Sequence, residues 1–185
     1  MTAESNEGKD PDIDTFWPRL RLGANLLIPL NDNLFFNSGI IYSQKGYHKT
    51  VERNGDLYLD GTFKINYLDI PLNIGVRLGN NNNFMLIGGA YLGYGIGKAK
   101  AKLDYWDPAN VLDSEDEHEF GDGGLQHIDF GLQGGLGYDF KYFNLVTKYH
   151  LGLTNIWGSE RTSGIDKWIN KSRILSISLI KYFDL

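Results

Sequence analysis

The sequence predicts an all-β fold, an antiparallel up-and-down β-barrel. Three observations lead to this prediction. Apolar and polar residues alternate within several segments, short and long connections alternate between these segments, and the polar face is rich in glycine. The 185 residues include 23 Gly, 11 Tyr and 10 Phe but only 5 Pro. No helical period of apolar residues recurs over a useful length, so strands and sharp turns are favoured over helices.

The composition excludes several classes of protein. Without cysteine, the chain has no disulfide framework, thiolate metal site or cysteine nucleophile. A formal net charge of −5, with scattered Lys and Arg residues, argues against nucleic-acid binding. No run of about 18 apolar residues predicts a transmembrane helix, and the polar residues 1–14 do not resemble a signal peptide.

Seven segments are predicted to be strands, and each is long enough to cross a bilayer, which takes about 9–11 tilted residues. They are residues 19–30, 34–45, 61–78, 84–98, 126–140, 143–155 and 173–183. Short turns at 31–33, 79–83 and 141–142 alternate with long loops at 46–60, 99–125 and 156–172. This layout is typical of outer-membrane barrels, which have periplasmic turns and longer extracellular loops.

The two faces of the predicted strands differ in chemistry. In residues 126–140, Ile128 and Leu132 lie on one face, whereas Asp129 and Gln133 lie on the other. A soluble β-sandwich also alternates. However, the glycine-rich polar face carries charges of both signs, which suits a narrow lumen, and aromatic residues gather near the strand ends, as at membrane interfaces. We therefore expect the apolar face to contact outer-membrane lipid. Pro71, inside a strand, predicts a bulge or a bend.

The polar face is expected to form a paired internal network, because an eight-stranded barrel has room only for its own side chains. The predicted members are Arg19, Arg21, Asp69, Asn73, Arg77, His127, Asp129, Gln133, Asp139, Lys148 and His150. In this arrangement His127 and His150 can face each other across neighbouring strands as a buried polar pair. Arginine is expected to be tolerated better at Gly135, on the lumen face, than at Leu136, because a lipid-facing Arg near mid-membrane costs about 2–4 kcal/mol.

The sequence predicts seven strands, which is an odd number. If the short turns lie in the periplasm, residues 19–30 run inward and the C-terminus lies in the periplasm. An unpaired strand edge in lipid costs several kcal/mol for each unsatisfied backbone group. We therefore expect an eighth, outward-running strand upstream of Met1. Residues 1–18 are then the remainder of the first extracellular loop, and residues 19–185 form the barrel domain.

Four motifs occur in a characteristic order: IYSQKG at 41–46, NYLDIPL at 66–72, GLGY at 135–138 and YHLGLTNI at 149–156. Together they resemble the PorT-like outer-membrane β-barrel family of Bacteroidetes. The C-terminus is similar to the aromatic-ended last strand that the barrel-insertion machinery recognises, with Tyr182 and Phe183 as the insertion signal. The resemblance implies location and fold, with no cofactor; a link to protein secretion follows only by analogy.

Five acidic residues in the longest predicted loop are a candidate cation site, because Ca²⁺ prefers oxygen ligands. They are Asp113, Glu115, Asp116, Glu117 and Glu119. Their spacing is not that of a dedicated calcium loop, so a solvated acidic loop is the expected alternative and no metal site is predicted.

No nucleophile elbow or other catalytic spacing stands out, so no catalytic residue is predicted. The sequence predicts a non-enzymatic outer-membrane barrel whose loops 46–60, 99–125 and 156–172 bind an envelope protein or a surface ligand. A lipid-modifying outer-membrane enzyme and a narrow solute channel are the alternatives.

Overall fold

The structure is a computed structural model of the chain. It describes eight stretches of the sequence, namely residues 2–4, 18–53, 56–79, 81–107, 110–121, 125–140, 142–156 and 169–181. Within them, no helix is long and apolar enough to cross a membrane. The predicted insertion signal, Tyr182 and Phe183, lies outside the described residues.

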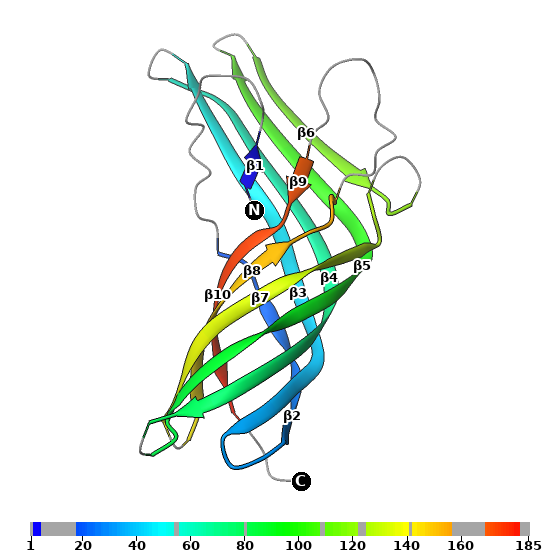
Figure 1. The fold of residues 1–185 in the computed structure, drawn as a ribbon. Coiled ribbons are helices and arrows are strands. Elements are labelled where there is room, and N and C mark those ends of the chain that lie inside the picture. Colours follow the sequence, from blue (N-terminus) through cyan, green and yellow to red (C-terminus); the bar gives the residue numbers. More distant parts are fainter. Residues whose placement is uncertain are drawn as a thin grey trace.

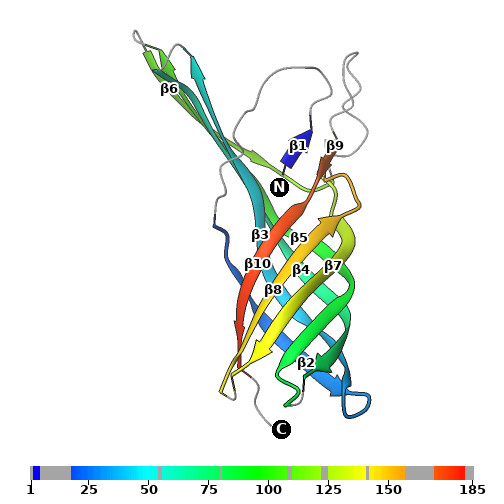
Figure 2. The same ribbon diagram turned by 60° about the vertical axis from the view of Figure 1, so that its left-hand side comes forward.

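The described residues form antiparallel strands that curl into an open barrel (Figures 1 and 2). The strands are β1 (Thr2–Glu4), β2 (Arg21–Pro29), β3 (Leu34–Arg53), β4 (Asp56–Leu78), β5 (Phe84–Asp107), β6 (Asn110–His118), β7 (Ile128–Asp139), β8 (Asn144–Gly152), β9 (Ile169–Lys171) and β10 (Arg173–Ile180). The wall runs in the order β10-β8-β7-β5-β4-β3-β2, and β6 pairs with β5. The predicted all-β, antiparallel up-and-down architecture is confirmed.

The barrel wall is apolar outside and polar inside. Along β7, Ile128 and Leu132 are half exposed on the outer face, whereas Asp129 and Gln133 are buried. The wall strands therefore point their apolar side chains outward and their polar side chains inward, as predicted, because successive side chains of a strand point to opposite faces.

Two apolar clusters lie inside the barrel. One is built from Phe63, Ile65 and Tyr67 of β4 and Ala99 of β5, together with Leu125, which precedes β7, and Ile156, which follows β8. The other lies near the short turns and consists of Phe35, Met85, Ile87 and Val146. We call the end of the barrel with the short turns the turn end, and the opposite end the far end.

Three wall strands, β3, β4 and β5, continue well beyond the far end, where β6 pairs with β5, so that the wall sheet protrudes from the barrel (Figures 1 and 2). We call the protruding part the sheet extension; it consists of residues 46–53, 56–62, 98–107 and 110–118. The pairing of β3 with β4 continues to Arg53 opposite Asp56, and β5 pairs with β6 from Ala99 to Asp107.

The sequence analysis assigned most of these residues to loops, and that assignment is wrong for 46–53, 56–60, 99–107 and 110–118. The physical reason is that most of this sheet lies beyond the barrel core. Residues 110–118 lack a regular apolar face and pair with β5 through charged residues, although residues 99–105 do alternate between apolar residues and Lys or Asp.

Of the bulge or bend predicted at Pro71, the strand pairing shows no bulge. The pairing of β3 with β4 skips the positions beside Pro71 but resumes in the same register, with Ser38 opposite Leu72 and Ile41 opposite Asp69. On its other side, Pro71 keeps its place opposite Tyr91 in β5. The missing backbone N–H therefore interrupts one ladder without shifting it.

The first described residues are also a strand. β1 pairs with β9, outside the barrel wall, where the sequence predicted the remainder of a loop. β1 does not fill the wall, since in the described part of the chain the outer edges of β2 and β10 have no strand partner.

Candidate functional site

A lysine lies at the centre of the barrel interior and joins three strands. Lys45 of β3 places its Nζ 2.9 Å from Oδ1 of Asp69 in β4 and 2.8 Å from Oδ2 of Asp129 in β7. The rings of Tyr67 and Tyr91 lie against the same ammonium group, with centroids at 4.5 and 4.8 Å. The ammonium group is thus surrounded by carboxylates and aromatic faces, both of which attract a cation.

A second cation completes the cluster from the open side of the wall. Arg21 of β2 lies 3.4 Å from Oδ2 of Asp69, and its Nη1 lies 2.6 Å from Nε2 of His150 in β8. Because a guanidinium group only donates hydrogen bonds, Nε2 of His150 is the acceptor. We call Arg21, Lys45, Asp69 and Asp129 the charged layer; its two cations and two carboxylates balance.

Neutral hydroxyl groups donate further hydrogen bonds to the carboxylate of Asp129. Tyr91 donates its hydroxyl to Oδ2 at 3.2 Å, and Thr154 donates to Oδ1. On the turn-end side lies a second buried chain, made of amides: Gln133 donates to Asn73 at 2.8 Å, and Asn73 donates to Asn37 at 3.4 Å. Buried polar groups with such partners hold the surrounding strands in one arrangement.

The structure brings six of the predicted network residues into these clusters, namely Arg21, Asp69, Asn73, Asp129, Gln133 and His150. The other five lie apart from them. Lys148 lines a cavity beside β2, together with Arg77 and Asp139. Arg19 donates to the carbonyl oxygen of Phe63, 3.3 Å away.

The predicted pairing of His127 with His150 is wrong. The register of β7 and β8 places Gln133, not His127, opposite His150. His127 instead stacks on Tyr94 and Phe120, with ring centroids at 5.2 and 5.1 Å. His127 lies before β7 begins, so it meets aromatic side chains at the far end and not the charged layer.

Three central residues were not among the predicted network members, namely Lys45, Tyr67 and Tyr91. Alternation along the strands already places Lys45 and Tyr67 on the polar face. What the pattern did not reveal is that these side chains, with Tyr91 of β5, meet Asp69 and Asp129.

The acidic candidates lie on or just after β6, and three of them, Glu115, Glu117 and Glu119, face lysines of β5. Glu117 lies 3.5 Å from Lys98 and 3.2 Å from Lys100, and Glu115 and Glu119 lie near the same lysines. The hydrogen bond and the charge of Lys100 lower the pKa of Glu117. The predicted acidic loop is therefore a charged strand, and among the described residues no three His, Cys, Asp or Glu side chains are grouped to hold a metal.

The family model of the outer membrane protein beta-barrel domain matches residues 4–158. The chain belongs to this family. No curated protein and no solved structure matched the chain. The exposed leucines and isoleucines of this outer-membrane β-barrel therefore face lipid, and aromatic side chains gather at the turn end, where Phe84 contacts Tyr138 and Phe140 stacks on Phe143.

Proposed function

We propose that this outer-membrane barrel is a non-enzymatic binding component of the cell envelope, which holds a rigid sheet at the cell surface for a protein partner. The observation that carries the proposal is the sheet extension. β3, β4 and β5 are 20, 23 and 24 residues long, whereas a bilayer crossing takes about 9–11. The excess length is paired strand and therefore presents a defined surface.

The interior supports an anchoring role. The charged layer is closed by its own hydrogen bonds, and apolar clusters lie inside the barrel on both sides of it. A solute path along the lumen would have to break these buried pairs, and each broken pair leaves an uncompensated charge. The barrel is on this basis an anchor and not a channel.

The edge of the sheet extension offers a docking mode. In the described part of the chain, β6 pairs with β5 on one side and has no strand on the other. Extended peptides add to such edges through backbone hydrogen bonds. β6 carries Glu115, Asp116 and Glu117 as exposed side chains, so the partner segment is expected to be basic.

The proposed orientation follows the layout of outer-membrane barrels. The turn end and the C-terminus lie in the periplasm, and the sheet extension lies outside the cell. Within this proposal, an envelope assembly such as a secretion complex is a candidate partner, on the strength of the resemblance to the PorT-like family alone.

Single cysteines test orientation and binding, because the chain has none of its own. Asp116→Cys, on β6, is expected to react with a membrane-impermeant maleimide on intact cells, whereas Asp32→Cys, in a short turn, is not. A cysteine-to-amine cross-linker is then expected to give a discrete protein adduct from Asp116→Cys and none from the lipid-facing control Leu132→Cys.

Three results would contradict the proposal. They are labelling of Asp32→Cys but not of Asp116→Cys, discrete conductance steps of the purified protein in planar bilayers, and a change in membrane lipid that a single Ser or His substitution abolishes without affecting folding. The last two would favour the channel and the enzyme, respectively.

A further inference from the structure

The cavity beside β2 lies between the charged layer and the turn end, and we call it the turn-end cavity. Its volume is about 900 Å³. Arg21 and His150 line it where it meets the charged layer, and Tyr142 and Asn144 line it at the turn end. Small-molecule sites usually have volumes of about 300–1,000 Å³, so the turn-end cavity has room for a ligand.

The lining of the turn-end cavity carries an excess of positive charge. Among the described residues that line it, four are cationic, namely Arg21, Arg77, Lys148 and Lys181, and Asp139 is the single carboxylate. Arg21 also contacts Asp69, so its charge is balanced within the charged layer. The excess therefore comes from the other cations.

Arg77 and Lys148 carry the charge that matters most. In the part of the chain that the structure describes, neither the guanidinium group of Arg77 nor the ammonium group of Lys148 contacts a carboxylate. The buried Nε of Arg77 also has no hydrogen-bond partner there, and its Cζ lies 5.7 Å from the ring centroid of Phe35. Unpaired charges inside a membrane-embedded barrel are costly, so these two cations favour the binding of an anion.

Both cations belong to the continuous part of the wall. Arg77 lies in β4, which pairs with β3 and β5, and Lys148 lies in β8, which pairs with β7 and β10. Strand pairs on both sides therefore hold these residues in place, whatever lies against the outer edges of β2 and β10. The excess of positive charge is a property of the wall itself.

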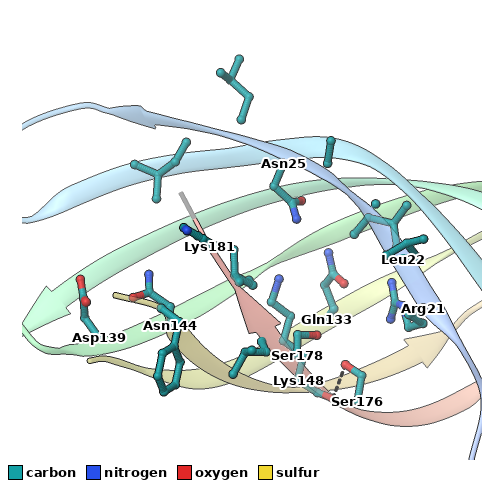
Figure 3. A pocket seen from close by; sticks show the side chains of 18 of the residues that line it. Arg21, Leu22, Asn25, Gln133, Asp139, Asn144, Lys148, Ser176, Ser178 and Lys181 are labelled. Carbon is teal, nitrogen blue, oxygen red and sulfur yellow. Dashed lines mark hydrogen bonds between the residues drawn. The ribbon is translucent and has the colours of Figure 1, made fainter. Parts of the chain in front are cut away.

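Neutral polar groups complete the lining. Lys148 and Asn25 point into the cavity from opposite sides (Figure 3). The buried Oδ1 of Asn25 has no hydrogen-bond partner among the described residues and can accept a hydrogen bond from a ligand hydroxyl group. Ser178 of β10 adds a hydroxyl group, which can donate to an oxyanion.

We propose that the turn-end cavity binds a phosphate monoester, whose phosphate group is held by Lys148 and Arg77. A phosphate monoester carries about −1.5 to −2 charges at neutral pH, which balances the two cations, whereas a carboxylate carries only one. The fork of a guanidinium group matches two phosphate oxygens, and an ammonium group supplies a point charge. This site lies at the opposite end of the barrel from the sheet extension and does not depend on the proposed protein partner.

Calorimetric titration of the full chain, refolded in neutral detergent micelles, tests the proposal with inorganic phosphate and glycerol 3-phosphate as probes. Glycerol 3-phosphate is expected to bind more tightly, because its hydroxyl groups can donate to Asn25. Lys148→Met and Arg77→Gln are each expected to lower the affinity about tenfold or more, since each removes a charged hydrogen-bond donor. The matched control is Lys181→Gln, which removes an exposed cation from the same lining and is expected to change the affinity little.

The same phosphate chemistry can come from a soluble molecule or from a lipid headgroup, and lipid vesicles distinguish the two sources. The protein is reconstituted in phosphatidylcholine vesicles, with or without phosphatidic acid, whose headgroup is a phosphate monoester. If glycerol 3-phosphate raises the urea midpoint of unfolding in phosphatidylcholine alone, the ligand is soluble. If only phosphatidic acid raises it, the ligand is a lipid headgroup. In either case Lys148→Met is expected to abolish the rise.

Three results would overturn the proposal. The first is that neither probe binds and phosphatidic acid does not raise the midpoint. The second is that Lys148→Met and Lys181→Gln bind the probes equally well. The third concerns folding: Lys148→Met removes an unpaired cation, so without ligand it is expected to be at least as stable as the unchanged protein. If it failed to refold, the ammonium group would be part of the structural network and not of a ligand site.

Discussion

The barrel interior and the sheet extension both join strands through lysine–carboxylate pairs, but in opposite surroundings. Lys45 is 1% exposed and contacts two carboxylates at 2.8 and 2.9 Å. Lys98 and Lys100 are 49% and 55% exposed, and their contacts with Glu117 are 3.5 and 3.2 Å long. The buried pairs hold three strands in one register, whereas water screens the exposed pairs, whose main effect is to keep an open edge soluble.

The largest loss of stability is expected from a substitution at Lys45. Lys45→Met keeps the approximate length of the side chain but leaves Asp129 buried without its cation, which costs about 3–5 kcal/mol. Urea unfolding of the protein in detergent micelles, followed by tryptophan fluorescence, measures the loss. Asp69 still has Arg21, so Asp129→Asn in the same background is expected to restore part of the stability. A Lys45→Met variant as stable as the unchanged protein would show that the charged layer does not hold the wall together.

A smaller effect is predicted for the outer surface of the wall. Leu132, near the middle of β7, and Leu136, closer to the turn end, are both exposed. An arginine facing lipid costs about 2–4 kcal/mol at the midplane and about 0–1 kcal/mol near the interfaces. Leu132→Arg is therefore expected to destabilise the protein in lipid vesicles more than Leu136→Arg, with urea unfolding as the measurement. If Leu132→Arg and Leu136→Arg lowered the free energy of unfolding equally, the result would contradict a wall that faces lipid.

Within the wall, the sequence was sufficient to predict the strands. The alternation of lipid-facing and lumen-facing residues fixed the inward side of Asp69, Asp129 and His150, because period two is a local property of a strand. The contacts among these residues were not predictable. They depend on the register of strands far apart in the sequence, as the error in pairing His127 with His150 shows.

At Gly135, alternation predicted the face correctly, but it did not reveal how little room that face has. This glycine faces inward as predicted, yet a Cβ atom there would lie 2.0 Å from the carbonyl oxygen of Thr147. Gly135→Arg would therefore have to displace the backbone of β8, while its predicted order relative to Leu136→Arg stays a prediction. At the neighbouring Gly134, on the outer face, the nearest atom is 3.8 Å away. Only the close approach of β7 and β8, which no pattern reveals, distinguishes the two glycines.

In the sheet extension, the same reasoning failed for a physical reason. Residues 110–118 carry a run of acidic side chains in place of a regular apolar face, whereas residues 99–105 alternate between apolar residues and Lys or Asp and were nevertheless assigned to a loop. Their signal was the register of charges, since Lys100 lies opposite Glu117 and Lys102 opposite Glu115. Such cross-strand pairs appear only once the two segments are placed side by side.

The smallest predicted effect concerns the exposed pairs. The hydrogen bond and the charge of Lys100 lower the pKa of Glu117, and Glu119 and Glu117 raise the pKa of Lys98. A lowered carboxyl pKa contributes stability at pH values above the unfolded pKa, and this contribution disappears as the pH falls through the folded pKa, below 4.5. A raised lysine pKa contributes below 10.5 and is lost as the pH rises through the folded value.

The β5–β6 pairs are therefore intact at neutral pH and weaken first in acid. NMR titration of the Glu117 carboxyl group is expected to give a pKa below 4.5, and Lys100→Gln is expected to move it upward, because the strongest donor is removed. Unfolding of the barrel should change little in this variant, since the exposed pairs are screened by water. If the pKa of Glu117 did not change in Lys100→Gln, the pair would not interact as described. If the barrel lost much stability in this variant, the exposed pairs would matter as much as the buried charged layer.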